Sequence, residues 1–279
     1  MVPLLRDVLH AAQLFSLPNV YIRLRQVLDN PEYTMTEVAA VIEKDPAITL
    51  QLLRIVNSSL YSFSARVDTV SRAVTLLGTK QIRDLVLASS IALSFKGISS
   101  NIIDIPRFWR RSIYCAAACQ HLAGRVGEYG RERLFVAGLL HDIGHLLMCQ
   151  AIPGLAQQAL VQALADNQPV HMVERSLLEF DYAVVGGELM RLWELPESLV
   201  ELVRCHLEPE QAQSHPVETA LVHLGALLAR AEHEEGTLGE GTLAATPHVW
   251  TMTGLTLEEC LAMREPITRD FEAITQFFS

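Results

Sequence analysis

The sequence lacks the features of an exported, membrane-embedded or disordered protein. Charged residues make up only 19% of its 279 residues and hydrophobic residues 50%, which excludes wholesale disorder. We find no unbroken apolar run of the about 18 residues that a membrane helix needs. Arg6, Asp7 and His10 interrupt the stretch where a signal peptide would be apolar. The five cysteines are odd in number and scattered. We therefore expect a cytoplasmic protein with reduced thiols and no membrane partner.

The sequence also has little sign of β-structure. Strand-like alternation is scarce, no glycine-rich phosphate loop follows a strand, and apolar residues recur at helical spacing almost throughout. Thr34 followed by Glu37 fits a capping box, and Asp45 with Pro46 fits the start of the next helix. In that helix we expect Leu50, Leu53 and Val56 to point inward. The sequence therefore predicts an all-α fold of many helices.

The predicted helices fall into three parts of the chain. We expect an N-terminal helical part over 1–100, a helical bundle over 101–232 on which it packs, and a C-terminal helical extension over 233–279. In the second and third parts the helices are predicted at 107–125, 132–149, 153–166, 181–193, 196–206, 215–232, 256–264 and 266–277.

Charge is unevenly spread along the chain, whose net charge is −10. Residues 1–140 carry 16 Lys and Arg against 11 Asp and Glu, whereas residues 141–279 carry 6 against 21. The acidic half disfavours a nucleic-acid partner. The most basic segment of the chain is 107–133. Arg107 and Arg125 lie in it and are candidates for contact with an anionic ligand or an acidic partner. A solvated helix face is the alternative explanation.

The segment 138–148, GLLHDIGHLLM, places His141 and Asp142 inside an apolar helical run, with His145 one turn later. Adjacent His and Asp side chains are typical metal ligands. His141 and His145 have the spacing of two ligands on one helical face, but no Glu follows the first His as in metalloproteases. The alternative for His145 is an ordinary helix position.

Several ordered motifs together resemble the HDOD domain family, which is distantly related to the HD metal-dependent phosphohydrolases. The first half carries DPAITLQLLRIVNSSLYS (45–62) and VSRAVTLLGTKQIRDLVLA (70–88). The second, HD-like half carries FWRRSIYCAAACQHLA (108–123) and VAGLLHDIGHLLM (136–148). The resemblance implies a bacterial signalling module with an N-terminal helical part on an HD-like bundle.

The same resemblance implies that most metal ligands of active HD enzymes are missing. Arg111 stands where an early His would fall, Tyr182 where a His often stands, and Gly225 where the closing Asp would be. The retained candidates are His141, Asp142 and His206. A guanidinium donates no lone pair to a metal and pairs well with a carboxylate. We therefore expect Arg111, or its neighbour Arg110, to bond Asp142 and fill the vacated position.

These observations favour a non-catalytic module without a cofactor. It would act through a signalling protein partner or a small, nucleotide-like anionic ligand, as the output part of a response-regulator system. The alternative is a phosphohydrolase or phosphodiesterase acting on nucleotides or cyclic dinucleotides, with one divalent ion held by His141, Asp142 and His206. A helix-turn-helix in the first half is a weaker alternative, because its charge is low. Asn57 and Ser58 could contact a partner or simply satisfy a helix end.

Overall fold

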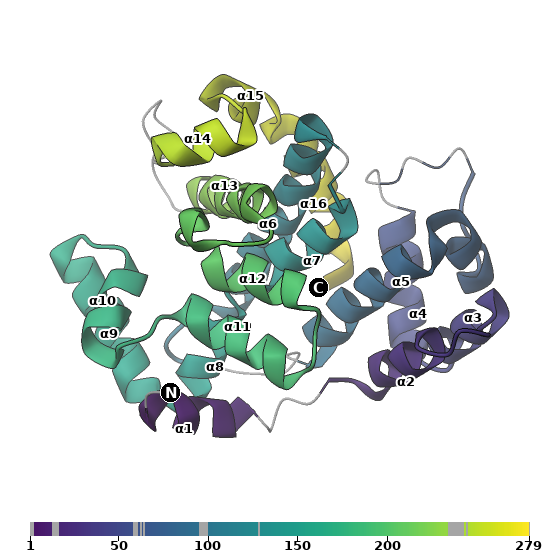
Figure 1. The fold of residues 1–279 in the computed structure, drawn as a ribbon, viewed down its shortest axis with the longest axis horizontal. Coiled ribbons are helices and arrows are strands. Elements are labelled where there is room, and N and C mark those ends of the chain that lie inside the picture. The colour runs from purple at the N-terminus through teal and green to yellow at the C-terminus, as the bar shows by residue number, and fades with distance from the viewer. Residues whose placement is uncertain are drawn as a thin grey trace. The chain divides into compact units, whose positions relative to one another are not determined.

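The computed structural model describes residues 3–12, 17–57, 61, 63, 65–94, 100–127, 129–233, 243 and 245–278. Every regular element in these ranges is a helix, as Figure 1 shows. The all-α prediction is therefore confirmed.

The chain divides into two compact units. The first comprises Met1–Ser16 and Ile98–Ala262, and the second comprises Leu17–Gly97 and Met263–Ser279.

In the second unit, side-chain caps fix the start of two helices and a glycine bends a third. They are α2 (Asn19–Leu28), α3 (Met35–Glu43), α4 (Pro46–Val56), α5 (Val70–Ser94) and α16 (Arg264–Phe278). Thr34 and Glu37 form the predicted capping box, and Asp45 accepts hydrogen bonds from two backbone amides at the start of α4. Gly78 bends α5 with a φ of 80°. Leu50 was predicted wrongly: it is 51% exposed, since Ile48, Leu52 and Ile55 face the core instead.

The first unit contains the remaining helices. They are α1 (Pro3–Ala12), α6 (Ile105–Val126), α7 (Arg131–Leu140), α8 (Ile143–Ala151), α9 (Pro153–Asp166), α10 (Val170–Leu178), α11 (Tyr182–Leu192), α12 (Glu197–Cys205), the 3-10 helix η1 (Pro209–Gln211), α13 (Pro216–His233), α14 (Pro247–Thr253) and α15 (Leu257–Ala262). α6 packs against α7 and α13, and α8 packs against α11 and α1. This packing explains why the first helix of the chain belongs here.

The predicted single helix over 132–149 is two helices, α7 and α8. Asp142 interrupts the helical run with φ −100° and ψ 7°. The stretch Arg131–Ala151 is long and apolar enough to cross a membrane, but 89% of its most apolar window is buried inside the fold. It is therefore core, with Leu134, Phe135 and Leu147 fully enclosed.

Helix α10 was not predicted, although Val170, Val173 and Leu177 carry the helical spacing that could have revealed it. It forms a hairpin with α9, which ends at Asn167 in the left-handed conformation. The pair has a small core of its own around Ala159, Ala163 and Val173. The hairpin is therefore a distinct helical layer beside the main bundle.

Candidate functional site

The His141–Asp142 pair lies at the junction of α7 and α8, deep in the first unit. His141 is 2% exposed and Asp142 3% exposed. Gly144 permits this arrangement, because a Cβ atom there would fall 1.9 Å from the carbonyl oxygen of Tyr182. Only glycine lets α8 approach α11 this closely. The motif thus brings the pair against Tyr182.

Arg111, on α6, makes the expected contact with Asp142. Its guanidinium donates a hydrogen bond to Oδ2 of the carboxylate, and the Asp142 side chain is 4% exposed. Burial raises the pKa of the Asp142 carboxyl, but the charges of Arg111 and His141 outweigh that effect and hold its pKa well below its usual value. Asp142 is therefore a buried carboxylate with an arginine as its counter-ion.

Two imidazoles flank this carboxylate in fixed orientations. The Nδ1–H of His141 donates to the carbonyl of Gly138 at 2.7 Å, which leaves Nε2 at 3.3 Å from Oδ2 of Asp142. The Nδ1–H of His206, at the end of α12, donates to the carbonyl of Val203 at 2.7 Å. The two rings meet edge to face with centroids 5.3 Å apart. Burial, together with the charge of His141, lowers the pKa of His206 to about 3, so this ring is neutral near pH 7.

His145 faces a different set of groups. Its ring stacks on Tyr182 with centroids 3.8 Å apart, and its Nδ1 lies 3.5 Å from Oε1 of Glu174. Burial lowers the pKa of His145 to about 4 and raises the pKa of Glu174 to about 8. Both side chains are therefore mainly uncharged near pH 7, and Glu174 can act as a hydrogen-bond donor.

Gly225 serves helix packing on α13. A Cβ atom at this position would lie 2.6 Å from Sγ of Cys119 and 3.2 Å from the carbonyl oxygen of Cys115, both on α6. The helices are too close together here for an aspartate to fit without displacing α6. The position where the resemblance led us to expect the closing Asp of HD enzymes is thus filled by a packing contact.

The donor set does not fit a metal ion. Across the described ranges, no group of three or more His, Cys, Asp or Glu side chains is placed to hold one. The Arg111 guanidinium lies against the carboxylate that would be a ligand and would repel a cation. Tyr182, at another expected ligand position, has a hydroxyl whose pKa burial raises well above its usual value, so it keeps its proton.

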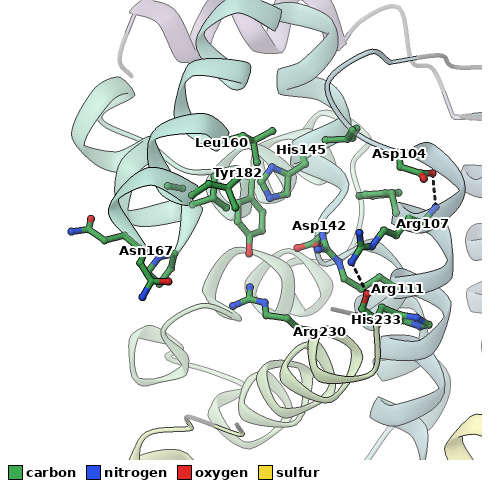
Figure 2. Close-up of a pocket in the computed structure, with 17 residues that line it drawn as sticks. Asp104, Arg107, Arg111, Asp142, His145, Leu160, Asn167, Tyr182, Arg230 and His233 are labelled. Carbon is green, nitrogen blue, oxygen red and sulfur yellow. Dashed lines mark hydrogen bonds and ion pairs between the residues drawn. The ribbon is translucent and has the colours of Figure 1, made fainter. Parts of the chain in front are cut away.

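A cavity of about 710 Å³ opens beside the Arg111–Asp142 pair. Figure 2 shows Arg107 and Arg111 entering it from α6, Arg230 from α13, and Tyr182 from α11. His145 lines it as well. The structure thus brings together Arg107, Arg111, Asp142, His145 and Tyr182 of the candidate residues. Three other candidate residues, His141, His206 and Arg110, do not line the cavity.

The other candidate residues have local roles. The Asn57 amide donates to the carbonyls of Leu53 and Val67 at 2.6 and 2.7 Å and accepts from the Val67 amide at 2.8 Å, which closes the end of α4. Arg125 pairs with Glu259 at 2.5 Å on the surface. Ser58 lies outside the described residues.

Two ionisable groups of this site, Glu174 and Arg230, were not predicted from the sequence. Glu174 is 2% exposed and accepts a hydrogen bond from the backbone amide of Tyr182 at 3.0 Å. Arg230 lines the cavity near the end of α13. The only sequence signal for Glu174 was a glutamate on the apolar side of an amphipathic helix, beside Val173. No local pattern distinguishes Arg230.

Comparison with known proteins finds a matching family and solved structures with a similar fold. The family profile described as the HDOD domain matches residues 14–209. A crystal structure from Shewanella amazonensis SB2B, of a protein named as a candidate phosphohydrolase, has a TM-score of 0.77 and 24% identity, with 98% of both chains covered. A protein from Marinobacter aquaeolei VT8 named as a candidate signal transduction protein has a TM-score of 0.71 and 24% identity, covering 98% of this chain and 65% of that one.

An uncharacterized protein of Treponema pallidum (strain Nichols) is 22% identical over 191 residues, which make up 68% of this chain and 37% of that protein. The matching region thus spans little more than a third of that relative's length. At these identities the solved structures show a shared fold and nothing about chemistry.

Proposed function

Because the chain belongs to the HDOD domain family, we propose that it is a non-catalytic signalling module that transmits a signal by binding instead of hydrolysis. One observation carries the proposal: the arginine that replaces an HD-type ligand is bonded to the carboxylate that remains. A metal enzyme needs that carboxylate free to bind the ion, and here its charge is already neutralised by Arg111.

Binding is the activity that the remaining features support. The cavity next to the pair is large and carries three arginines. A protein partner and a place at the output of a response-regulator system follow from the family alone. The relative from Marinobacter aquaeolei VT8, named for signal transduction, is in keeping with this role.

A second candidate is a phosphohydrolase with one divalent ion, and one observation favours it. In the described part of the chain, Nε2 of His206 is buried without a hydrogen-bond partner, while its Nδ1–H is held by a carbonyl. Metal-ligating histidines are commonly held in this way. An ion at this place would be bound by His206, His141 and Asp142 and would activate water, but it would have to displace Arg111 from Asp142.

A turnover assay separates the two candidates. The purified chain is incubated with bis(4-nitrophenyl) phosphate and with nucleotide phosphodiesters in added Mn²⁺ or Fe²⁺. We expect no hydrolysis above that of the Asp142→Asn variant, which serves as the matched control. Metal-dependent turnover that is lost in Asp142→Asn would overturn the proposal in favour of the phosphohydrolase.

A further inference from the structure

The cavity beside Asp142 has a cationic side in a chain whose net charge is −10. Three guanidinium groups line it, against the two carboxylates of Asp104 and Asp142. Asp142 is paired with Arg111, and Asp104 accepts a hydrogen bond from the backbone amide of Arg107 at the start of α6, at 3.0 Å. The lining therefore carries net positive charge, which favours an anionic ligand.

Tyr182 adds a polar group to the cationic side of the cavity. The residue is 2% exposed, and Figure 2 shows its hydroxyl pointing into the cavity, as the Arg230 guanidinium does. Because the hydroxyl stays protonated, it is a donor aimed at the same space as the arginines.

The opposite side of the cavity is apolar. It is formed by the α9–α10 hairpin, with Leu160, Leu164 and Val170 among its lining residues. Leu164 is 83% exposed although it lines the cavity, so a ligand with an apolar face would cover it. The side-chain amides of Asn167 and Gln168 lie at the same end and can pair with polar edges of a ring.

We propose that this cavity binds a nucleotide, with a phosphate against Arg107, Arg230 and the Tyr182 hydroxyl, and with the base against the α9–α10 hairpin. A small inorganic anion would leave the apolar side in water, and a nucleoside would bring no phosphate to Arg107, Arg230 and Tyr182. The volume of about 710 Å³ lies within the range of sites for ligands of nucleotide or dinucleotide size. This inference rests on the proposed function, because it treats the site as a ligand sensor and not as a metal centre.

Isothermal titration of the full chain tests the proposal. The probes are the common 5′-mononucleotides, the 3′,5′-cyclic forms of AMP and GMP, and the cyclic dinucleotides of adenine and guanine. Inorganic phosphate and the free nucleosides are titrated at the same ionic strength. We expect at least one nucleotide to bind once per chain, at least 10-fold more tightly than either phosphate or its own nucleoside. If no nucleotide exceeds both fragments, the proposal is overturned.

Variants locate the site. Arg230→Gln and Tyr182→Phe are each expected to weaken binding of that nucleotide at least 10-fold. Arg125→Gln is the matched control, since Arg125 lies on the same helix as Arg107 but pairs with Glu259 on the surface. Each variant's melting midpoint is measured without ligand, so that loss of folding is recognised. Unchanged affinity in folded Arg230→Gln and Tyr182→Phe would contradict the assignment to this cavity.

Different results would overturn the non-catalytic role and the nucleotide-binding proposal. A chain that neither hydrolyses phosphodiesters nor binds any nucleotide would leave the non-catalytic assignment in place and remove the nucleotide. Metal-dependent hydrolysis would overturn the non-catalytic assignment, whatever the binding result.

Discussion

The guanidinium of Arg111 and the carboxylate of Asp142 form an ion pair between α6 and the α7–α8 junction. Asp142 is 4% exposed at its side chain and Arg111 28% exposed, so the pair is shielded from water on the carboxylate side. A carboxylate buried to this degree needs a partner of opposite charge. In an HD-type enzyme that partner would be a metal ion, and here it is part of the polypeptide.

Arg111→Ala removes this partner and leaves the carboxylate buried. We expect the free energy of unfolding to fall by about 3 kcal/mol, the lower end for breaking a buried ion pair, because Arg111 is partly exposed. Urea denaturation measures the change. In the double variant Arg111→Ala/Asp142→Asn no charge is left unpaired, so more than half of the loss should be recovered. Additive losses in the double variant would contradict the pairing.

Arg111→His replaces the cation with a third imidazole near His141 and Asp142. We expect this variant to bind Mn²⁺ or Zn²⁺ more tightly than the wild-type chain, by at least 10-fold, because it adds a ligand and removes a repulsive charge. Titration calorimetry of the two proteins makes the comparison. Arg111→Gln is the control for loss of charge alone and should show a smaller gain than Arg111→His.

Glu174 gives the stability a distinctive dependence on pH. Burial raises its pKa to about 8 in the folded state, above the usual 4.5, so its stabilising contribution is complete below pH 4.5 and is lost as pH rises through 8. His145 and His206, with pKa values of about 4 and 3, act in the opposite direction and only below pH 6.5. Between pH 6.5 and 8, therefore, Glu174 is the one of these three groups that titrates.

The wild-type chain should thus lose stability from pH 6.5 to 8, by at most about 1.4 kcal/mol per pH unit from this group. Glu174→Gln keeps the shape and the neutral state, so this part of the slope should disappear. Guanidinium denaturation at several pH values measures both proteins. Glu210→Gln, an exposed position, is the control and should keep the wild-type slope. A Glu174→Gln slope equal to that of the wild type would refute the shift.

Gly225 should tolerate no side chain. The Cβ atom of Gly225→Ala would lie 2.6 Å from the Cys119 sulfur, and we expect a loss of about 1–3 kcal/mol, as for overpacked cores. Gly154→Ala is the control, since no atom lies within 4 Å of its added Cβ. Chemical denaturation of both variants tests the difference. Equal stabilities would show that α13 can move away from α6 at little cost.

Structural features that depend on near neighbours in the chain could be predicted from the sequence. The caps at Thr34 and Asp45 are set by groups within three residues, and both formed as predicted. The Arg111–Asp142 contact could be predicted because the motif of a known family aligned the two positions. The prediction that Leu50 points inward was wrong, because α4 buries Ile48 and Leu52 of the same apolar stretch instead.

The rest of the site depends on contacts between distant segments. Glu174 meets His145 on α8 and Tyr182 on α11 only in the folded chain, and nothing in its own helix reveals these partners. Arg230 reaches the cavity from the end of a long helix whose other residues serve the core. The break between α7 and α8 lies within an apolar run whose pattern predicts one helix. These features follow from packing, which the local pattern does not encode.

Elemental analysis of the untagged, purified chain tests the central claim most directly. The protein is loaded with Mn²⁺, Fe²⁺ and Zn²⁺ in separate samples, dialysed, and measured for metal per chain. If Arg111 is the counter-ion of Asp142, each sample should hold far less than one ion per chain, and Asp142→Asn should hold the same. One ion per chain in the wild type, lost in Asp142→Asn, would show instead that the site is a working metal centre.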